Sequence, residues 1–402
     1  MIKFRRIFPY KGEIVKICRS YMQKGVISVD IASYINQLLH QAVQIQASDV
    51  HIEPQHDSLR IRMRVDGQLF ETGRVDICYA TAIVSRIKVM SRLDIGEKRI
   101  PQDGVFSFEP NDQKLEIRIS TLPTIYGEKV VMRLLRLREK PYTMEELGLE
   151  TDQQRKITHL LSRNSGLMIV TGPTGSGKTT TLYTLLKALN QSRTNIVSLE
   201  DPVELQLDGI NQVQIHPKSG LTYACALRSV MRQDPDVIMI GEIRDEEIAN
   251  IAVSAVLTGH LVLTTLHTAD AAGAVIRLLD LKVEPYRLAA SLIGVIAQRL
   301  VRRVCIRCDG EGCNHCRQTG YRGRTGVFEV MEVNHALAEQ IVHQKTWMQI
   351  RETLVDSGMK PLEEMVLECV KKGKTTMEEW MRVVDGDAVD KETVEFRAVH
   401  GV

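Results

Sequence analysis

The chain has 402 residues, more than one hydrophobic core usually holds, so two domains are expected. Its 52 Lys and Arg nearly balance 50 Asp and Glu, and 44% of its residues are apolar, which excludes a wholly disordered chain. No segment reaches the ~18 apolar residues of a membrane-spanning helix, and the start MIKFRRIF lacks an apolar signal core. We therefore expect a cytoplasmic protein without a targeting peptide, peripherally associated with the inner face of the cytoplasmic membrane.

Residues 1–45 form a short N-terminal segment that is basic at first and helical later. Seven Lys or Arg and one Glu occur among the first 24 residues, with Phe4, Phe8 and Tyr10 between them. This stretch fits either a solvated helix face or a contact with an acidic membrane surface or partner. Apolar residues then recur at helical spacing over residues 31–45.

Residues 46–138 predict a smaller α+β domain, because strand-like alternation of apolar and polar residues appears at 59–65 and 114–119. Residues 139–150, with Lys140, Pro141 and Gly148, break both periodicities. We interpret them as an interdomain linker.

Residues 151–333 alternate short apolar runs with helical patterns. The runs at 167–171, 195–199, 237–240 and 261–266 predict buried parallel strands. Residues 334–402 are charged and helical in pattern. The predicted fold class is therefore α/β: a RecA-like P-loop domain with a smaller α+β N-terminal domain and a helical C-terminal tail.

A glycine-rich motif, GPTGSGKT, follows the first of these strands and precedes the helical pattern TTLYTLLKALN. This strand–loop–helix context is the one that a P-loop (Walker A) requires. Its backbone N–H groups would converge on phosphates at a helix N-terminus, Lys178 would reach the β and γ oxygens, and Thr179 would ligate Mg²⁺. The predicted MgATP site comprises Gly172, Pro173, Thr174, Gly175, Ser176, Gly177, Lys178, Thr179 and Thr180.

Hydrolysis of a nucleotide also needs carboxylates at the ends of neighbouring strands. Glu200 and Glu242 follow two of the apolar runs, and either could orient water or help to hold Mg²⁺; a helix N-cap is the alternative for each. Asp236 precedes its run and is expected at the far end of that strand, so Glu242 occupies the position of a Walker B aspartate. His260 and His267 flank the run LVLTTL, where one or both could sense the γ-phosphate or be merely structural.

Four of the eight cysteines lie within twelve residues, a bunching that suggests a metal site more than a disulfide scaffold. Two CxxC pairs separated by four residues could place four thiolates around structural Zn²⁺, and free reduced thiols are the alternative. The predicted ligands are Cys305, Cys308, Cys313 and Cys316. Asp49, His51 and Glu53 share a strand face, but we do not assign them a metal.

These motifs resemble the secretion-ATPase superfamily, the motors of type II secretion, type IV pilus extension and the competence pseudopilus. ASDVHIEP at 47–54, RVDG at 64–67, KRIPQDG at 98–104 and STLPTIYGE at 120–128 resemble its N-terminal domain. The P-loop, LEDPVEL at 199–205, QDPDVIMIGEIRD at 233–245 and TGHLVLTTLHT at 258–268 resemble its four nucleotide motifs in order. The resemblance covers about residues 45 to 330.

The resemblance implies an ATPase that works as a homohexamer, holds ATP between its two domains and couples to a polytopic inner-membrane platform protein and, through it, to pilin-like filaments. Only about 45 residues precede ASDVHIEP, as in competence-type or other Gram-positive forms. Retraction motors of the superfamily generally lack the tetracysteine element, so this element favours assembly. A nucleic-acid translocase is the rival from another class; no recognition motif supports it, and no direct nucleic-acid partner is expected.

Three arginines outside the P-loop match positions that the superfamily uses to contact the γ-phosphate. Arg118 projects from the polar side of an alternating strand pattern, and Arg133 lies in the apolar stretch KVVMRLL, where a guanidinium needs an anionic partner. Arg324 follows the cysteines on what we expect to be a glycine-flexed loop. A salt bridge to a carboxylate is the alternative for Arg118 and Arg133.

Overall fold

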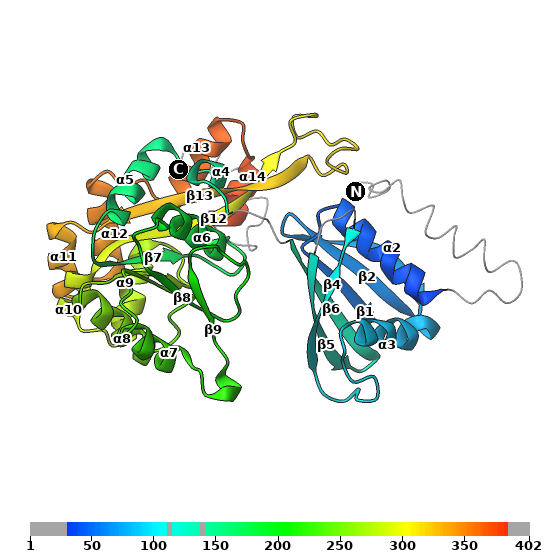
Figure 1. The fold of residues 1–402 in the computed structure, drawn as a ribbon. Helices are drawn as coiled ribbons and strands as arrows, with labels where there is room; N and C mark the ends of the chain where they lie inside the picture. Colours follow the sequence, from blue (N-terminus) through cyan, green and yellow to red (C-terminus); the bar gives the residue numbers. More distant parts are fainter. Residues whose placement is uncertain (1–29, 111–114, 137–140, 385–402) are drawn as a thin grey trace, which may run out of the picture. The chain divides into compact units, whose positions relative to one another are not determined.

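The structure is a computed structural model that describes residues 30–110, 115–136 and 141–384. It divides into two compact units, drawn in Figure 1. The first comprises the chain through Glu139 together with Arg307–Arg322; the second comprises Lys140–Ile306 and the chain from Gly323 onward. Among the described residues, no helix combines the length and the hydropathy needed to cross a bilayer. The basic stretch of the first 24 residues lies outside the described residues.

The first unit is built on a six-stranded antiparallel sheet with the order β3-β2-β1-β6-β5-β4. Both alternating stretches predicted from the sequence lie in strands, β2 and β5. Apolar and polar residues alternate along β2, and its apolar residues are the buried ones. The elements are α2 (Ile31–Gln44), β1 (Asp49–Pro54), β2 (Ser58–Val65), β3 (Gln68–Asp76), η1 (Ile77–Tyr79), α3 (Ala80–Met90), β4 (Gln102–Phe108), β5 (Leu115–Thr124) and β6 (Gly127–Arg136).

Helices α2 and α3 supply side chains to the same core as this sheet. Ile35 and Leu39 of α2 and Ile87 of α3 are fully buried in one cluster with the apolar residues of the strands. The predicted domain boundary at residue 45 is therefore wrong, because the apolar stripe of α2 packs against the first sheet. The alternate residues of β1, including Asp49 and Glu53, carry the charges of the sheet's other side.

The second unit contains a seven-stranded sheet with the order β13-β12-β7-β11-β10-β8-β9. From β12 to β9 in this order, each strand runs parallel to the next. All four strands predicted for this region are present, and the predicted α/β fold is confirmed. The strands are β7 (Gly166–Thr171), β8 (Ile196–Glu200), β9 (Asn211–Gln214), β10 (Val237–Ile240), β11 (Leu261–Leu266), β12 (Leu292–Val304) and β13 (Tyr321–Glu332).

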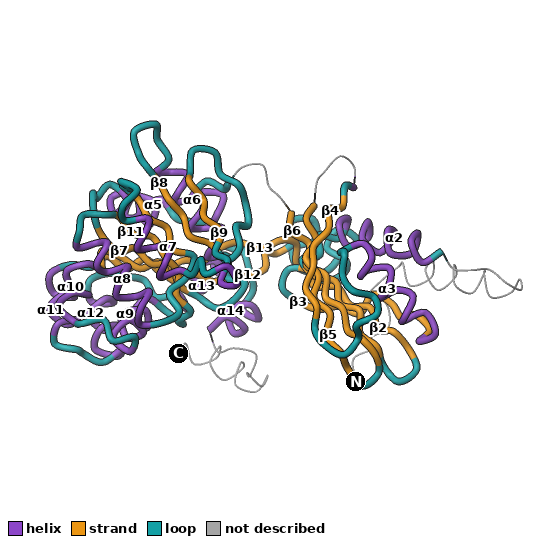
Figure 2. Tube along the Cα trace, turned by 60° about the horizontal axis from the view of Figure 1, so that its bottom comes forward, coloured by secondary structure: helices purple, strands orange, loops and turns teal. Residues whose placement is uncertain are grey.

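Helices cover both faces of this sheet, which explains why its central strands are mostly apolar. Alternate residues of β7 belong to two different cores, one shared with α5 and α6 and the other with α7 to α13. Figure 2 shows α8 to α12 gathered on one side of the strands and α5 and α6 on the other. The helices are α4 (Met144–Leu147), α5 (Thr151–Leu161), α6 (Lys178–Leu189), α7 (Tyr223–Val230), α8 (Glu246–Leu257), α9 (Ala271–Asp280), α10 (Pro285–Ser291), α11 (His335–Val342), α12 (Trp347–Asp356), α13 (Leu362–Lys371) and α14 (Met377–Val384), with a 3₁₀ turn η3 (Pro217–Ser219).

The stretch predicted as a linker, 139–150, is folded in its second half. Thr143 caps α4 and forms a capping box with Glu146, and the helix ends at Gly148 in the left-handed region. Leu147 and Leu149 are buried in the core of the second unit. These residues are therefore part of that core, although Gly148 does break the helical period as predicted.

The predicted helical C-terminal tail is helical through Val384; residues 385–402 lie outside the described part. Its helices α11 to α13 share the larger core of the second unit. The buried ion pair between Arg302 of β12 and Glu379 of α14, 2.8 Å long, fastens the last helix to the sheet. The tail thus packs as part of the P-loop unit.

Candidate functional site

The P-loop joins the carboxyl end of β7 to the start of α6, as the sequence predicts. Gly172 has a φ of 151°, and a Cβ there would lie 2.5 Å from the carbonyl oxygen of Gln298 and 2.6 Å from Ser176 Oγ. Gly177, the N-cap of α6, has a φ of 90° and offers no side-chain cap. The first-turn N–H groups of α6 are therefore left for an anion, the arrangement that binds phosphate in P-loop proteins.

Lys178 lies folded against this loop. Its ammonium group donates to the carbonyl oxygens of Gly172 at 2.9 Å and Pro173 at 3.1 Å, and lies 3.4 Å from His267 Nδ1. Burial lowers the pKa of Lys178, and the nearby Glu242 carboxylate opposes that shift. Within the described residues, the buried hydroxyl of Ser176 has no hydrogen-bond partner. A tight glycine cradle, a buried cation and an unpaired hydroxyl fit a bound phosphate group.

Glu242 and His267 reach this cation from the ends of two neighbouring strands. Glu242 lies two residues beyond β10 and His267 directly follows β11; His267 Nε2 is 3.3 Å from Glu242 Oε2. Arg244 Nε donates to Glu242 Oε1 at 2.6 Å. The structure thus brings together Lys178, Glu242 and His267, three residues predicted from the sequence. With the Thr179 hydroxyl in the first turn of α6, these groups include the oxygen ligands that Mg²⁺ prefers.

Glu200 occupies a different environment from Glu242. Its carboxylate is 3% exposed and accepts hydrogen bonds from Tyr183, from Ser198 at 2.6 Å and from Gln212 at 3.0 Å. These donors occupy a carboxylate that has little access to solvent, which favours an anchoring role. Its neighbour Asp201 is more exposed and lies 3.7 Å from Arg244. Sequence reasoning did not single out Asp201 or Arg244, although both lie within the motifs quoted above.

His260 is not part of this constellation. It precedes β11, and its carbonyl oxygen accepts from Gly166, the first residue of β7. Its Nδ1 lies 2.8 Å from the carbonyl oxygen of Ala255. The six residues of β11 separate it from His267, a span of roughly 23 Å of extended chain. The prediction that His260 senses the γ-phosphate is therefore wrong: it lies at the amino edge of the parallel sheet, whereas the P-loop lies at the carboxyl edge.

The family profile described as "Type II/IV secretion system protein" matches residues 28–382 of the chain. The chain belongs to this family. The type II secretion system protein HxcR of Pseudomonas aeruginosa is 48% identical over 358 residues, covering 87% of this chain and 76% of that protein. The type IV pilus assembly ATPase PilB of Myxococcus xanthus is 42% identical over 399 residues, covering 92% and 70%. A crystal structure of the pilus retraction motor PilT with bound ADP is 25% identical, with a TM-score of 0.61, covering 89% of this chain and 98% of that chain.

Membership of the type II/IV secretion system family confirms the resemblance drawn from the motifs and the prediction of an ATP-hydrolysing enzyme. It also confirms the predicted class of motor, one that serves secretion or pilus assembly. ATP and Mg²⁺ follow from the family, and the P-loop residues described above fit both. The roles of individual residues, the oligomer and the membrane partner are taken up below as proposals.

Arg118 and Arg133 lie side by side on β5 and β6 of the first unit, where they are directly paired in register. Arg118 Nε donates to Glu116 at 3.1 Å, and Arg133 Nε donates to Asp49 at 2.9 Å. The salt bridges considered as the alternative are thus present for both arginines. Arg324 is exposed and lies in β13, so the expectation of a loop at this position is wrong.

The acidic residues of β1 are surrounded by cations in this structure. Glu53 pairs with Arg60, Arg62 and Lys129. Burial disfavours its charged form, but the hydrogen bonds from Arg62 and Lys129 outweigh burial and lower the pKa of Glu53 to about 2. Carboxylates so paired are poor metal ligands.

The four clustered cysteines converge between β12 and β13. Their sulfur atoms all lie within 4.8 Å of one another; Cys308 and Cys316 are 3.6 Å apart, and Cys313 and Cys316 are 3.7 Å apart. A tetrahedron of thiolates at the usual zinc–sulfur distance of about 2.3 Å has edges of about 3.8 Å. The cluster therefore has the shape and the chemistry of a structural zinc site.

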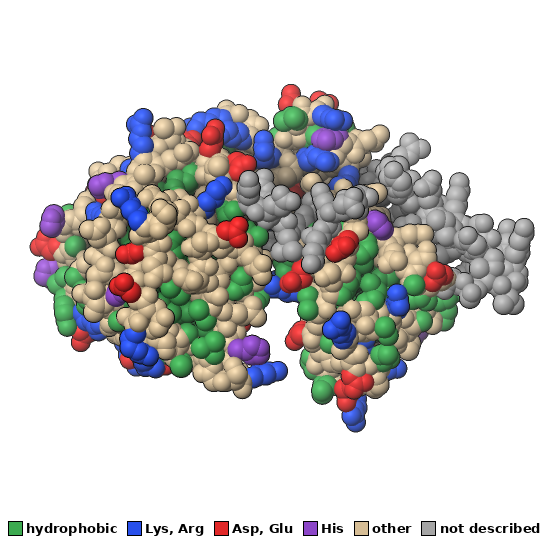
Figure 3. All heavy atoms as spheres, in the orientation of Figure 1, with side chains coloured by type: hydrophobic (Ala, Val, Ile, Leu, Met, Phe, Trp, Pro, Cys, Tyr) green, Lys and Arg blue, Asp and Glu red, His purple; other side chains and the backbone are tan. Residues whose placement is uncertain are grey.

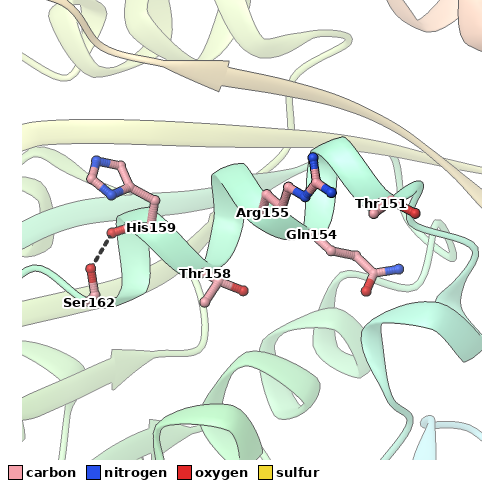
Figure 4. Close-up of a pocket in the computed structure, with 6 residues that line it drawn as sticks. All are labelled: Thr151, Gln154, Arg155, Thr158, His159 and Ser162. Atoms are coloured by element: carbon pink, nitrogen blue, oxygen red, sulfur yellow. Dashed lines mark hydrogen bonds between the residues drawn. The ribbon is translucent and has the colours of Figure 1, made fainter.

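A separate hollow of about 530 Å³ runs along the outer side of α5 (Figure 4). Six residues of this one helix and its C-terminal end line it: Thr151, Gln154, Arg155, Thr158, His159 and Ser162. None of the predicted site residues lies among them. The hollow is thus distinct from the nucleotide site of this family member, and we assign it no ligand.

Proposed function

We propose that the chain is the hexameric motor that powers assembly of a type II secretion pseudopilus or a type IV pilus-like filament, in protein export or DNA uptake. The observation that carries this proposal is the convergence of Lys178, Glu242 and His267 at the carboxyl edge of a RecA-like sheet, in a chain of this family. In this proposal hydrolysis of ATP at the P-loop drives a movement that a membrane platform protein converts into filament growth.

In this proposal each residue has a role that its position supports. Lys178 neutralises the β- and γ-phosphate oxygens, and the N–H groups of the P-loop and the first turn of α6 orient them. The Thr179 hydroxyl and the carboxylate of Glu242 or Asp201 would hold Mg²⁺, which supplies charge neutralisation at the phosphates. Glu242 orients the attacking water, and His267 contacts the γ-phosphate while hydrogen bonded to Glu242.

Three arginines outside the P-loop complete the site in this proposal, two of them in the first unit. Arg118 and Arg133 give up their carboxylate partners, Glu116 and Asp49, for the γ-phosphate of ATP, and Arg324 adds a third guanidinium. A bidentate guanidinium fork suits this charge better than an ammonium does. Because ADP lacks the γ-phosphate, only ATP would draw the two units together, so hydrolysis and domain motion become one event.

Assembly is favoured over retraction by two observations. The tetracysteine cluster is typical of assembly motors, and the relatives above include an assembly ATPase and a secretion protein at 42% and 48% identity, against 25% for the retraction motor PilT. The retraction motor remains the second candidate, since the retraction motor's fold covers most of this chain. Filament growth or loss in a deletion strain complemented with this chain separates the two.

A direct nucleic-acid function has little support in the charges of the chain. Its formal charge is +2, and the face drawn in Figure 3 carries Lys and Arg interspersed with Asp and Glu. Proteins that grip a nucleic-acid backbone need a concentrated positive surface. We expect DNA to leave ATP turnover unchanged at any salt concentration, and salt-dependent stimulation would favour the translocase instead.

The decisive test of the proposed ATPase site is Lys178→Ala. We expect turnover to fall below detection while the fold persists, because no neighbouring side chain can replace the ammonium group between the phosphates. Lys187→Ala, on the exposed side of the same helix α6, is the matched control and should keep the wild-type rate. Wild-type hydrolysis by folded Lys178→Ala would refute the assignment of the P-loop.

A further inference from the structure

We infer that the C-terminal helices hold the segment 267–270 in its working position, so that Trp347 and Arg351 of α12 are positioning residues for ATP hydrolysis. The inference rests on the proposed contact between His267 and the γ-phosphate and extends it to a part of the chain that carries no nucleotide motif. All the contacts involved lie within the second unit.

The beginning of this segment is tied to the strand that carries the P-loop. The N–H of Thr268 donates to Thr171 Oγ1 at 2.9 Å, and the two threonine hydroxyls lie 2.7 Å apart. Thr171 is the last residue of β7. The guanidinium of Arg299 donates to the carbonyl oxygen of Ala269 at 2.6 Å. His267 therefore sits in a segment whose backbone is fixed directly to the phosphate-binding element.

The end of the segment, Asp270, is held by α12. Its carboxylate is nearly buried, caps α9 by accepting the N–H of Gly273 at 2.7 Å, and lies with both oxygens 3.0 Å from the indole nitrogen of Trp347. Arg351 donates to the same carboxylate at 3.4 Å, pairs with Glu363 of α13, and lies 5.3 Å from the centre of the Trp347 ring. Hydrogen bonds to a charged acceptor in a shielded place are among the stronger ones in a protein.

A second buried carboxylate reinforces this link. Glu329 of β13 is 2% exposed and accepts the N–H of Ala271 at 2.9 Å and that of Leu362 at 3.0 Å. These are the first residues of α9 and α13. One carboxylate thus joins the starts of two helices, one of them continuous with the segment that contains His267. A displacement of residues 267–270 must therefore disturb α12 and α13 as well.

The two tryptophans of the chain provide a matched pair for a test. Trp347 donates to Asp270, whereas Trp380 of α14 donates to the backbone oxygen of Glu363 at 2.8 Å. Trp380→Phe leaves Trp347 as the only indole, and we expect its fluorescence to change when ADP or a non-hydrolysable ATP analogue binds. Trp347→Phe leaves Trp380, whose emission should not respond.

The same pair separates positioning from general stability. Trp347→Phe removes one hydrogen bond to a buried carboxylate, and we expect kcat to fall on the order of tenfold with KM for ATP changed by less than about twofold. Trp380→Phe should keep the wild-type kcat. Arg351→Lys retains the charge but not the fork, so a smaller loss of kcat is expected. Thermal unfolding of each variant establishes that it is folded.

Calorimetric titration measures nucleotide binding independently of fluorescence, so an absent fluorescence change can be told apart from absent binding. If nucleotide binds the Trp380→Phe protein and the emission of Trp347 does not change, the inference is overturned and the proposed function stands. If neither Trp347→Phe nor Arg351→Lys lowers kcat, it is likewise overturned. Failure of the folded wild-type protein to bind nucleotide would overturn the proposed function and this inference together.

Discussion

The phenolic hydroxyl of Tyr183 donates a hydrogen bond to the carboxylate of Glu200, which joins the P-loop helix α6 to the end of β8. Both side chains are buried, and the same hydroxyl accepts the N–H of Glu204 at 3.1 Å. Burial raises the pKa of Tyr183, and its hydrogen bond to Glu200 raises it further. The phenol therefore stays protonated and remains a donor at any physiological pH. We conclude that Glu200 fixes two elements of the site relative to each other.

Replacing Tyr183 by Phe tests this anchoring role. The change removes one donor from a buried carboxylate, so we expect the free energy of unfolding to fall by about 1.5–3 kcal/mol. Urea denaturation followed by circular dichroism measures it. Tyr223→Phe is the control and should lose less, because among the described residues the hydroxyl of this buried tyrosine has no hydrogen-bond partner. Equal, small losses in the two variants would contradict an anchor at Glu200.

Glu242 and Glu200 should respond differently to an isosteric change of charge. Glu242→Gln is expected to bind ATP and lose turnover, about 10³-fold or more, since in the proposed mechanism its charge orients the attacking water. Glu200→Gln should chiefly lose stability, because an amide cannot accept hydrogen bonds at both of its ends. Turnover, nucleotide affinity and melting temperature are measured for each, with Glu246→Gln on the exposed first turn of α8 as control. A stable, inactive Glu200→Gln beside an active Glu242→Gln would reverse the two roles.

The tetracysteine cluster is expected to hold one zinc ion per chain. Metal binding there should supply about 10 kcal/mol of local folding free energy, so a chelator should increase hydrogen exchange in residues 305–322 without melting the second sheet. Elemental analysis of purified protein gives the stoichiometry. Cys308→Ser should lose the ion, whereas Cys225→Ser, at an exposed cysteine of α7, should keep it. Protein without zinc and with four titratable thiols at this site would refute the prediction.

Arg118→Ala and Arg133→Ala should each cost about 10³-fold or more in turnover, by analogy with arginine fingers. Their ion pairs with Glu116 and Asp49 are partly exposed and contribute little to stability, so the loss should not reflect unfolding. Arg74→Ala removes a similar pair in the same unit and serves as control. ATP turnover near the wild-type rate in both Arg118→Ala and Arg133→Ala would contradict a role for these arginines in hydrolysis. If mixing either variant with Lys178→Ala protein restores activity, the arginine acts across a subunit interface.

Glu329 predicts a pH dependence of stability. Burial raises its pKa from 4.5 to about 7, against the opposing effect of its hydrogen bonds from Ala271 and Leu362. Between these two values the folded chain keeps a proton that the unfolded chain releases, so stability falls as the pH rises across this window, by about 3 kcal/mol in total. Glu329→Gln cannot titrate, and its unfolding free energy should lack this component. If the unfolding free energies of the wild type and of Glu329→Gln change in parallel from pH 4.5 to 8, the predicted contribution of Glu329 is contradicted.

The central strands and the P-loop were predictable because each depends on local chemistry. A strand buried on both faces is mostly apolar, and a loop that wraps phosphate needs glycine where a Cβ would collide, as at Gly172. Glu242 and His267 followed from the same reasoning, since parallel strands present their carboxyl ends at one edge. The prediction for His260 was wrong because only the carboxyl end of β11 lies at the edge that carries the P-loop, and His260 precedes the amino end of this strand.

Other features depend on contacts that the sequence does not encode locally. Asp270 and Trp347 are 77 residues apart in the chain, and no periodicity connects them. Tyr183 lies in an apolar helix, so the sequence predicts a buried ring but not the hydrogen bond from its hydroxyl to Glu200. Helix α4 is only four residues long, too short for a periodic pattern, although its capping box was visible at Thr143 and Glu146. Side-chain pairing across elements therefore required the structure.

Strand β12 connects the surroundings of the P-loop with the cysteine cluster. It runs beside β7 through Ala297, touches the P-loop helix where Gln298 accepts a hydrogen bond from Thr181 at 2.6 Å, and ends one residue before Cys305. The distance from Gln298 to Cys305 is roughly 23 Å of extended chain. Near its far end, Arg302 is clamped by the fully buried Glu379. β12 is thus anchored at two points beyond the P-loop, at Gln298 by the P-loop helix and at Arg302 by helix α14, and these contacts restrict movement of the strand between them.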